Sequence, residues 1–188
     1  LLPKAHGALD AASAVADKHG ANPRERRHLA ALSAWLNEDM AGALADWEAI
    51  LANHPRDGLA LRLAHHFHFY LAPGKAMRAS INRVLDAWDE SAPNYGFVLG
   101  MASFAHEEAG EYEPAERFGR AAVERNPKDT WAVHAVAHVM EMQGRTDEGI
   151  QWLSGSAENW SPRNMLAYHN WWHLALYHLE QNETATVL

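Results

Sequence analysis

Prolines recur at nearly regular intervals along the chain, and this spacing limits the possible folds more than any other feature of the sequence. Five of the eight prolines follow stretches with helical periodicity, at intervals of 32, 38, 34 and 35 residues, and they are Pro23, Pro55, Pro93, Pro127 and Pro162. Proline ends a helix because it lacks an N–H donor and its ring clashes with the preceding turn. The chain is therefore divided into short helical units of similar length.

A repeat of about 34 residues closed by proline is typical of the tetratricopeptide repeat, in which each unit is a pair of helices. Such a pair cannot bury its apolar faces alone, so successive pairs stack on one another. No stretch shows the alternation of apolar and polar residues that a β-strand requires. The sequence therefore predicts an all-α, tetratricopeptide-like right-handed superhelix of antiparallel helix pairs, which is an α-solenoid.

We expect a single helical repeat array over residues 1–188, with units at about 24–55, 56–93, 94–127 and 128–162 and partial units at both ends. The clearest unit has a predicted helix at 94–109, a turn at Gly110 and a second helix at 112–125. Glycine suits the end of a helix because it adopts positive φ without a Cβ clash. Since both ends of the sequence fall within a repeat, we also expect the chain to be a fragment of a longer repeat protein whose flanking helices are missing here.

The second helix of each unit must approach the first closely, which calls for a small residue at one fixed position. The alignment of units on their prolines puts Ala11, Ala43 and Ala115 at this position. Ile81 and Gly149 match less well. Residues 72–74, Ala-Pro-Gly, are expected to break the unit at 56–93 into two helices.

Composition excludes several classes of function. The formal net charge of −8 and the scattering of only 16 Lys and Arg argue against a nucleic-acid partner. No apolar run reaches the about 18 residues needed to span a bilayer, and the first residues lack a signal-peptide pattern, so we expect a soluble, cytoplasmic protein. The absence of Cys excludes disulfides and thiolate chemistry.

The first helix of each repeat lines the concave groove of such an array, and side chains at helical spacing share that face. Applied to each unit, this register predicts a histidine-rich groove. The predicted groove residues are His66, Tyr70, Phe104, Glu107, Trp131, His134, His138, Glu141, His169 and His173. The last four histidines form two pairs with i, i+4 spacing, so each pair shares one helix face.

Four interpretations of this groove remain open. The aromatic and imidazole rings could simply fill the interior of the array. Alternatively, the groove binds a peptide, a protein partner or a small ligand, with Tyr70, Phe104 and Trp131 as apolar walls. A third interpretation is a metal site of Zn²⁺ or Fe²⁺ on His134, His138, His169 and His173, because paired imidazoles on one helix can bind one ion. Acid–base catalysis by histidine without metal is the fourth, and the sequence identifies no catalytic residue.

The sequence makes a more specific prediction for each of two pairs of consecutive residues. Glu107 and Glu108 most simply occupy the end of a helix and its solvent face. Trp171 and Trp172 are expected to divide between the core and the groove, because consecutive helical residues point in different directions.

Residues 115–180 resemble the tetratricopeptide repeat protein 38 family. Two blocks carry the resemblance, NPKDTWAVHAVAHVMEMQG at 126–144 and HNWWHLALYHLE at 169–180. The resemblance implies a divergent tetratricopeptide superhelix within a protein longer than 188 residues. It implies no particular activity, but it includes His134, His138, Glu141, His169 and His173 in the most recognisable blocks.

Overall fold

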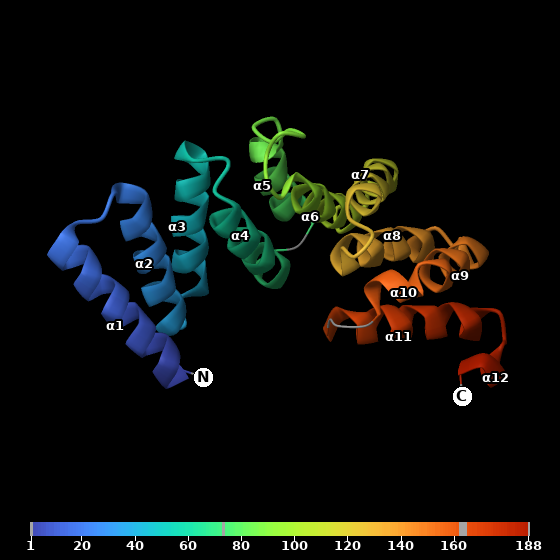
Figure 1. Cartoon of the computed structure of the whole chain (residues 1–188). Helices are drawn as coiled ribbons and strands as arrows, with labels where there is room; N and C mark the ends of the chain where they lie inside the picture. Colours follow the sequence, from blue (N-terminus) through green and yellow to red (C-terminus); the bar gives the residue numbers. More distant parts are fainter. Residues whose placement is uncertain (1, 73, 162–164, 188) are drawn as a thin grey trace. The chain divides into compact units, whose positions relative to one another are not determined.

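The computed structural model describes residues 2–72, 74–161 and 165–187, and every regular element in these ranges is a helix. Consecutive helices form antiparallel pairs. The prediction of an all-α fold of helix pairs is therefore confirmed. The chain divides into two compact units, Leu1–Trp88 and Asp89–Leu188, and Figure 1 labels the helices of each.

The first unit contains five of the helices: α1 (Leu2–His19), α2 (Pro23–Leu36), α3 (Met40–Asn53), α4 (Gly58–Leu71) and α5 (Lys75–Leu85). Pro23 is the first residue of α2, where its missing N–H is not needed, and Asn22 and Glu25 form a capping box around it. Pro55 and Pro127 closely follow helices that end at Asn53 and Arg125, as predicted, whereas Pro93 lies in the loop between Leu85 and Tyr95, just before the next helix begins. Pro162 and Pro73 lie outside the described residues.

Two side-chain clusters hold this unit together. Trp35, Trp47 and Phe67 contact one another edge to face with ring centroids 4.8 to 6.1 Å apart, and they join α2, α3 and α4. Glu48 on α3 accepts hydrogen bonds from His68 on α4 and Ser80 on α5, at 2.7 and 2.5 Å. Burial raises the pKa of Glu48, but these hydrogen bonds and the nearby charge of Arg83 outweigh it and lower the pKa. Glu48 is therefore an ionised link between three helices.

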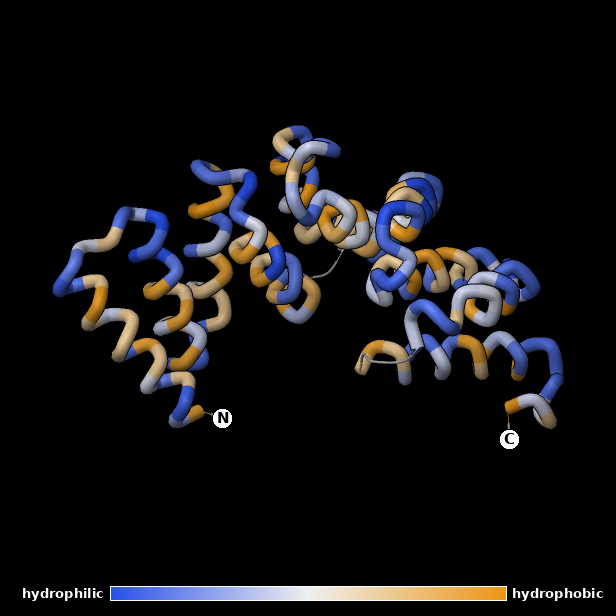
Figure 2. The backbone as a smooth tube through the Cα atoms, viewed as in Figure 1, coloured by the Kyte–Doolittle hydropathy of each residue, from blue (hydrophilic) through white to orange (hydrophobic). Residues whose placement is uncertain are grey.

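The second unit contains the remaining described helices: α6 (Tyr95–Glu107), α7 (Tyr112–Arg125), α8 (Thr130–Met142), α9 (Thr146–Gly155), α10 (Ala157–Trp160), α11 (Met165–Glu180) and α12 (Thr184–Val187). The predicted glycine turns are present, because Gly110 and Gly144 have φ of 76° and 65°. The short helix α10 was not predicted. In Figure 2 the turn between α11 and α12 is hydrophilic, while apolar residues occur within the helices.

Small residues occupy the close approaches between helices, although not at every predicted position. Ala43 and Ala115 are fully buried as expected, whereas Ala11 is exposed, because α1 packs mainly on α2. Gly149, a weaker match to the pattern, makes the closest approach: a Cβ there would lie 2.3 Å from the ring of Tyr177. The absence of a side chain at Gly149 therefore allows α9 to pack on α11.

The core of the second unit joins α8, α9 and α11. Val136 and Met140 of α8 pack with Leu153 of α9 and Tyr177 of α11, all fully or almost fully buried. Within the part of the chain that the structure describes, no helix combines the length and apolar character needed to cross a membrane.

Candidate functional site

Four histidines from two helices of the second unit form one cluster. His134 and His138 lie one turn apart on α8, and His169 and His173 lie one turn apart on α11. One nitrogen from each ring can be chosen so that all four lie within 4.8 Å of one another. The structure thus brings together the four histidines that the sequence singles out as metal ligands.

Polar and aromatic contacts hold α8 and α11 side by side. The Tyr177 hydroxyl donates to the carbonyl of Ala137 at 2.5 Å, and the Asn170 amide donates to the carbonyl of Thr130 at 3.5 Å. At the start of α8, the side chain of Asp129 accepts from the backbone N–H of Ala132 at 3.1 Å. These contacts flank the cluster and fix the two helices that carry it.

The cluster is buried on one side and open on the other. His134 and His173 are only 4% and 2% exposed, whereas His138 is partly buried and His169 lies at the exposed edge. The ring of Phe104 packs against Trp131 and His134, with centroid distances of 4.7 and 5.8 Å. The apolar surroundings on the buried side strengthen electrostatic interactions within the cluster.

Hydrogen bonds orient the rings. His173 donates from Nδ1 to Oε2 of Glu141 at 2.7 Å, and its Nε2 lies 3.1 Å from Nε2 of His169. Nδ1 of His138 lies 3.6 Å from Oε1 of Glu107. In the described ranges, both ring nitrogens of His134 and Nε2 of His138 are buried with no hydrogen-bond partner. Each buried nitrogen without a hydrogen-bond partner destabilises the fold by about 1–3 kcal/mol. A bound ion could use these nitrogens as ligands.

The rings are held mostly in the neutral form, which is the form that binds metal. Burial, together with the other three histidines, lowers the pKa of His134 well below its ordinary value. Burial, His138 and His169 lower the pKa of His173 to about 3, and burial and His138 lower the pKa of His169. Burial opposes protonation of His138 too, but its close contact with Glu107 and the nearby carboxylates Glu141 and Glu108 raise its pKa.

The distances suit a transition metal after small side-chain adjustments. Bonds of about 2.0–2.1 Å in a tetrahedron separate ligand nitrogens by about 3.3 Å, close to the 3.1 Å between His169 and His173. The 4.8 Å limit for the whole set requires the rings to move inward on binding. Imidazole ligands suit Zn, Cu, Fe and Ni.

The other predicted groove residues fall into two groups. In the second unit, Glu107 and Glu141 contact the cluster, Phe104 is buried and Trp131 is partly buried. In the first unit, His66 and Tyr70 pack ring to ring at 4.9 Å on α4, and Tyr70 is 63% exposed.

Two of the more specific predictions need correction. Glu107 is only 6% exposed, because it lies next to His138 at the packed end of α6, and Glu108 is partly buried, so neither residue lies on a fully solvated face. Trp171 and Trp172 do not divide between core and groove, since both are about half exposed. Trp171 contacts Trp160, and Trp172 stacks on His169 with ring centroids 5.2 Å apart.

Two residues that position the site were missed from the sequence. Tyr177 and Asn170 tie α11 to α8. For Tyr177 a signal was present, because His169, His173 and Tyr177 recur every four residues and share one face of a helix. Asn170 has no comparable pattern.

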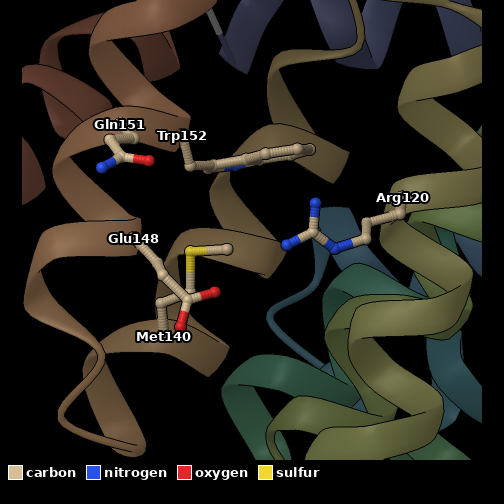
Figure 3. Close-up of a pocket in the computed structure, with 5 residues that line it drawn as sticks. All are labelled: Arg120, Met140, Glu148, Gln151 and Trp152. Atoms are coloured by element: carbon tan, nitrogen blue, oxygen red, sulfur yellow. The ribbon is translucent and has the colours of Figure 1, made fainter.

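A separate shallow pocket of about 250 Å³ lies between α7, α8 and α9. Its lining residues are Arg120, Met140, Glu148, Gln151 and Trp152, which include none of the clustered histidines. Figure 3 shows the Arg120 side chain reaching toward Trp152, and its guanidinium carbon lies 5.0 Å from the ring centroid. This contact supplies an additional link between α7 and α9.

Comparison with known proteins supports the fold. No family model matches the chain. Among solved structures, one described as "MamA RS-1 ArsTM double mutant" is similar, with a TM-score of 0.65, 13% identity, and coverage of 89% of this chain and 89% of that chain. Another, "Crystal structure of MamA protein", has a TM-score of 0.64 and 11% identity, covering 87% of this chain and 85% of that one. MamA is a tetratricopeptide-repeat protein, and at this identity the likeness shows a tetratricopeptide-like helical repeat fold.

Proposed function

We propose that this chain binds one divalent transition metal ion, Zn²⁺ or Fe²⁺, through His134, His138, His169 and His173. The observation that carries the proposal is the meeting of four imidazoles from two helices, with ligand nitrogens within 4.8 Å of one another. Structural metal sites use ligand sets of this size. The repeat fold places α8 beside α11, and each of these helices contributes one pair of histidines.

The competing interpretation, in which the histidines only pack, explains the hydrogen bonding less well. A packed cluster gains stability when each ring nitrogen finds a donor or an acceptor. Here, among the described residues, both nitrogens of His134 and Nε2 of His138 find none. A bound cation gives these nitrogens a partner and removes the cost of leaving them unpaired.

Elemental analysis tests the proposal. The purified protein is incubated with Zn²⁺ or, anaerobically, with Fe²⁺, passed through a desalting column and analysed for metal per chain. We expect about one ion per chain for the wild type and for a His6→Ala, His19→Ala control, whose two histidines are exposed on α1. The His134→Ala, His173→Ala variant should retain almost none. Absence of metal in the wild type, or equal retention by this variant, would refute the proposal.

A second candidate function is the binding of a peptide, a protein partner or a small ligand next to the cluster. It is favoured by the exposed aromatic side chains of α11, because Trp172 is 52% exposed beside His169 and Tyr168 is 79% exposed. Exposed aromatic residues are common at binding surfaces. Buried Phe104 would support Trp131 rather than touch the ligand.

Chemical-shift mapping with peptides selected from a random library tests the second candidate. Perturbed amides on α8 and α11 would support it, and loss of binding in Trp172→Ala would place Trp172 at the contact. Perturbations confined to 113–124, on α7, would contradict it.

Three broader predictions stay open beside these functions. We propose membership of the tetratricopeptide repeat protein 38 family from the two quoted blocks, which hold all four histidines. The single continuous array over residues 1–188 and the cytoplasmic location also stay predictions from the sequence.

A further inference from the structure

Two carboxylates lie directly outside the histidine cluster. Glu141 is on α8 one turn after His138, and Glu107 is the last residue of α6. Glu141 accepts a hydrogen bond from Nδ1 of His173 at 2.7 Å, and Glu107 lies 3.6 Å from Nδ1 of His138. Each of the two i, i+4 histidine pairs therefore contains one histidine that has a carboxylate behind it.

This placement determines which ring nitrogen faces the centre. When Nδ1 holds a proton that is shared with a carboxylate, the lone pair of the ring lies on Nε2. In His173 that nitrogen points toward Nε2 of His169, 3.1 Å away. In His138, Nε2 is buried without a hydrogen-bond partner among the residues described. A carboxylate behind a histidine is the usual outer support of a metal-binding imidazole.

The same carboxylates also lack ordinary counter-charges. In the described part of the chain, no Lys or Arg forms an ion pair with Glu107 or Glu141; their charged contacts are to His138 and His173. Glu107 is 6% exposed, and its Oε2 has no hydrogen-bond partner. A buried carboxylate without a cation is unfavourable. A dication would balance the two carboxylates when all four imidazoles bind it as neutral ligands.

His–Glu pairs occur elsewhere in the chain and are not sufficient evidence on their own. His178 donates from Nδ1 to Glu183 at 2.7 Å at the end of α11. That pair is not part of the four-histidine group. What distinguishes Glu107 and Glu141 is that the histidines they contact turn their other nitrogen toward further imidazoles.

We propose that Glu107 and Glu141 are positioning residues of the metal site, which fix the Nδ1–H form of His138 and His173 and make the site selective for a dication. This inference rests on the proposed metal-binding function. It adds the charge of the ion and two residues that act through the ligands rather than by contacting the metal.

The test measures Zn²⁺ affinity by competition with a chromogenic chelator at pH 7.4. Glu141→Gln and Glu107→Gln keep the size of the side chain but remove its charge, and we expect each to weaken Zn²⁺ binding about 10–100-fold. Glu183→Gln removes the same kind of carboxylate outside the cluster and should leave the affinity within about twofold of wild type. Glu141→Asp keeps the charge and should recover part of the lost affinity.

Two further readouts separate positioning from a general effect on folding. Co²⁺-loaded single variants should keep the absorption bands of a nitrogen-ligated site, because the four ligands are unchanged. The double variant Glu107→Gln, Glu141→Gln should lose more affinity for Zn²⁺ than for the monovalent ion Ag⁺, measured by the same competition. An equal loss for both ions would overturn the selectivity for a dication.

The outcomes for the two proposals are distinct. A wild-type protein that binds none of Zn²⁺, Fe²⁺ and Co²⁺ refutes the metal site itself. A wild type that binds Zn²⁺ together with Gln variants of unchanged affinity overturns only the role of the carboxylates. If circular dichroism shows that Glu107→Gln does not fold, the Zn²⁺ affinity of Glu141→Gln decides the question, because Glu141 is the more exposed of the two residues.

Discussion

His173 on α11 donates a hydrogen bond from Nδ1 to Glu141 on α8, with 2.7 Å between the two atoms. This bond crosses between the two helices that carry the cluster, and it turns Nε2 of His173 toward His169. The arrangement of the site therefore depends on how closely α8, α9 and α11 pack. The first prediction concerns that packing.

Gly149→Ala should destabilise the second unit. A Cβ at this position would lie 2.3 Å from the ring of Tyr177, and the rigid ring cannot yield without moving α11. Overpacking of this kind costs about 1–3 kcal/mol, which urea unfolding would measure. Gly155→Ala, in the same helix with nothing within 4 Å of the added Cβ, is the matched control and should be neutral or slightly stabilising. Equal stability of Gly149→Ala and wild type would show that α9 and α11 are not packed as described.

Acid should destabilise the first unit through His65. Burial, followed by the charges of Arg62, His68 and His66, lowers the pKa of His65 from 6.5 to about 3. The unfolded chain takes up a proton near pH 6.5 and the folded chain does not, so stability is full above pH 6.5 and is lost as the pH falls toward 3. Between pH 6.5 and 5 the loss is about 2 kcal/mol.

The measurement for His65 compares urea unfolding at pH 7 and pH 5 in a metal chelator. His65→Leu should lose less stability between the two pH values than the wild type does. His6→Leu, at an exposed position, controls for the added leucine. Identical pH dependence in wild type and His65→Leu would mean that His65 is already protonated in the folded protein.

Zn²⁺ should raise the stability of the second unit. An ion that binds the folded chain alone adds about 2.7 kcal/mol at a free concentration of 100 times Kd. We expect a higher midpoint of thermal unfolding with Zn²⁺, reversal by a chelator, and no shift in His134→Ala, His173→Ala. An equal shift in that variant would attribute the effect to other sites on the protein.

The sequence predicted most of the fold because helix boundaries depend on local chemistry. Gly110 and Gly144 mark the turns through positive φ, and Pro55 and Pro127 follow the ends of α3 and α7. The repeat pattern gives Gly149 only as a weak match, because it favours Ala at this position and cannot show that a tyrosine ring lies opposite. The exposure of Ala11 likewise depends on which helices lie beside α1.

The candidate site was predictable in its members and less so in its details. Spacing of four residues on two helices selects the histidines, and a repeat brings such faces together. Burial of Glu107 could not be read from the sequence, because an acidic pair at a helix end is usually solvated and only the contact with His138 shows otherwise. The contact of Trp171 with Trp160 depends on α10, a four-residue helix without a clear sequence signal.

X-ray absorption spectroscopy of the Zn²⁺-loaded protein tests the central claim most directly. The account predicts a first shell of about four nitrogen atoms at about 2.0 Å, with the outer-shell scattering of imidazole rings. A shell dominated by oxygen, or one with fewer than three imidazoles, would contradict a metal site built by His134, His138, His169 and His173.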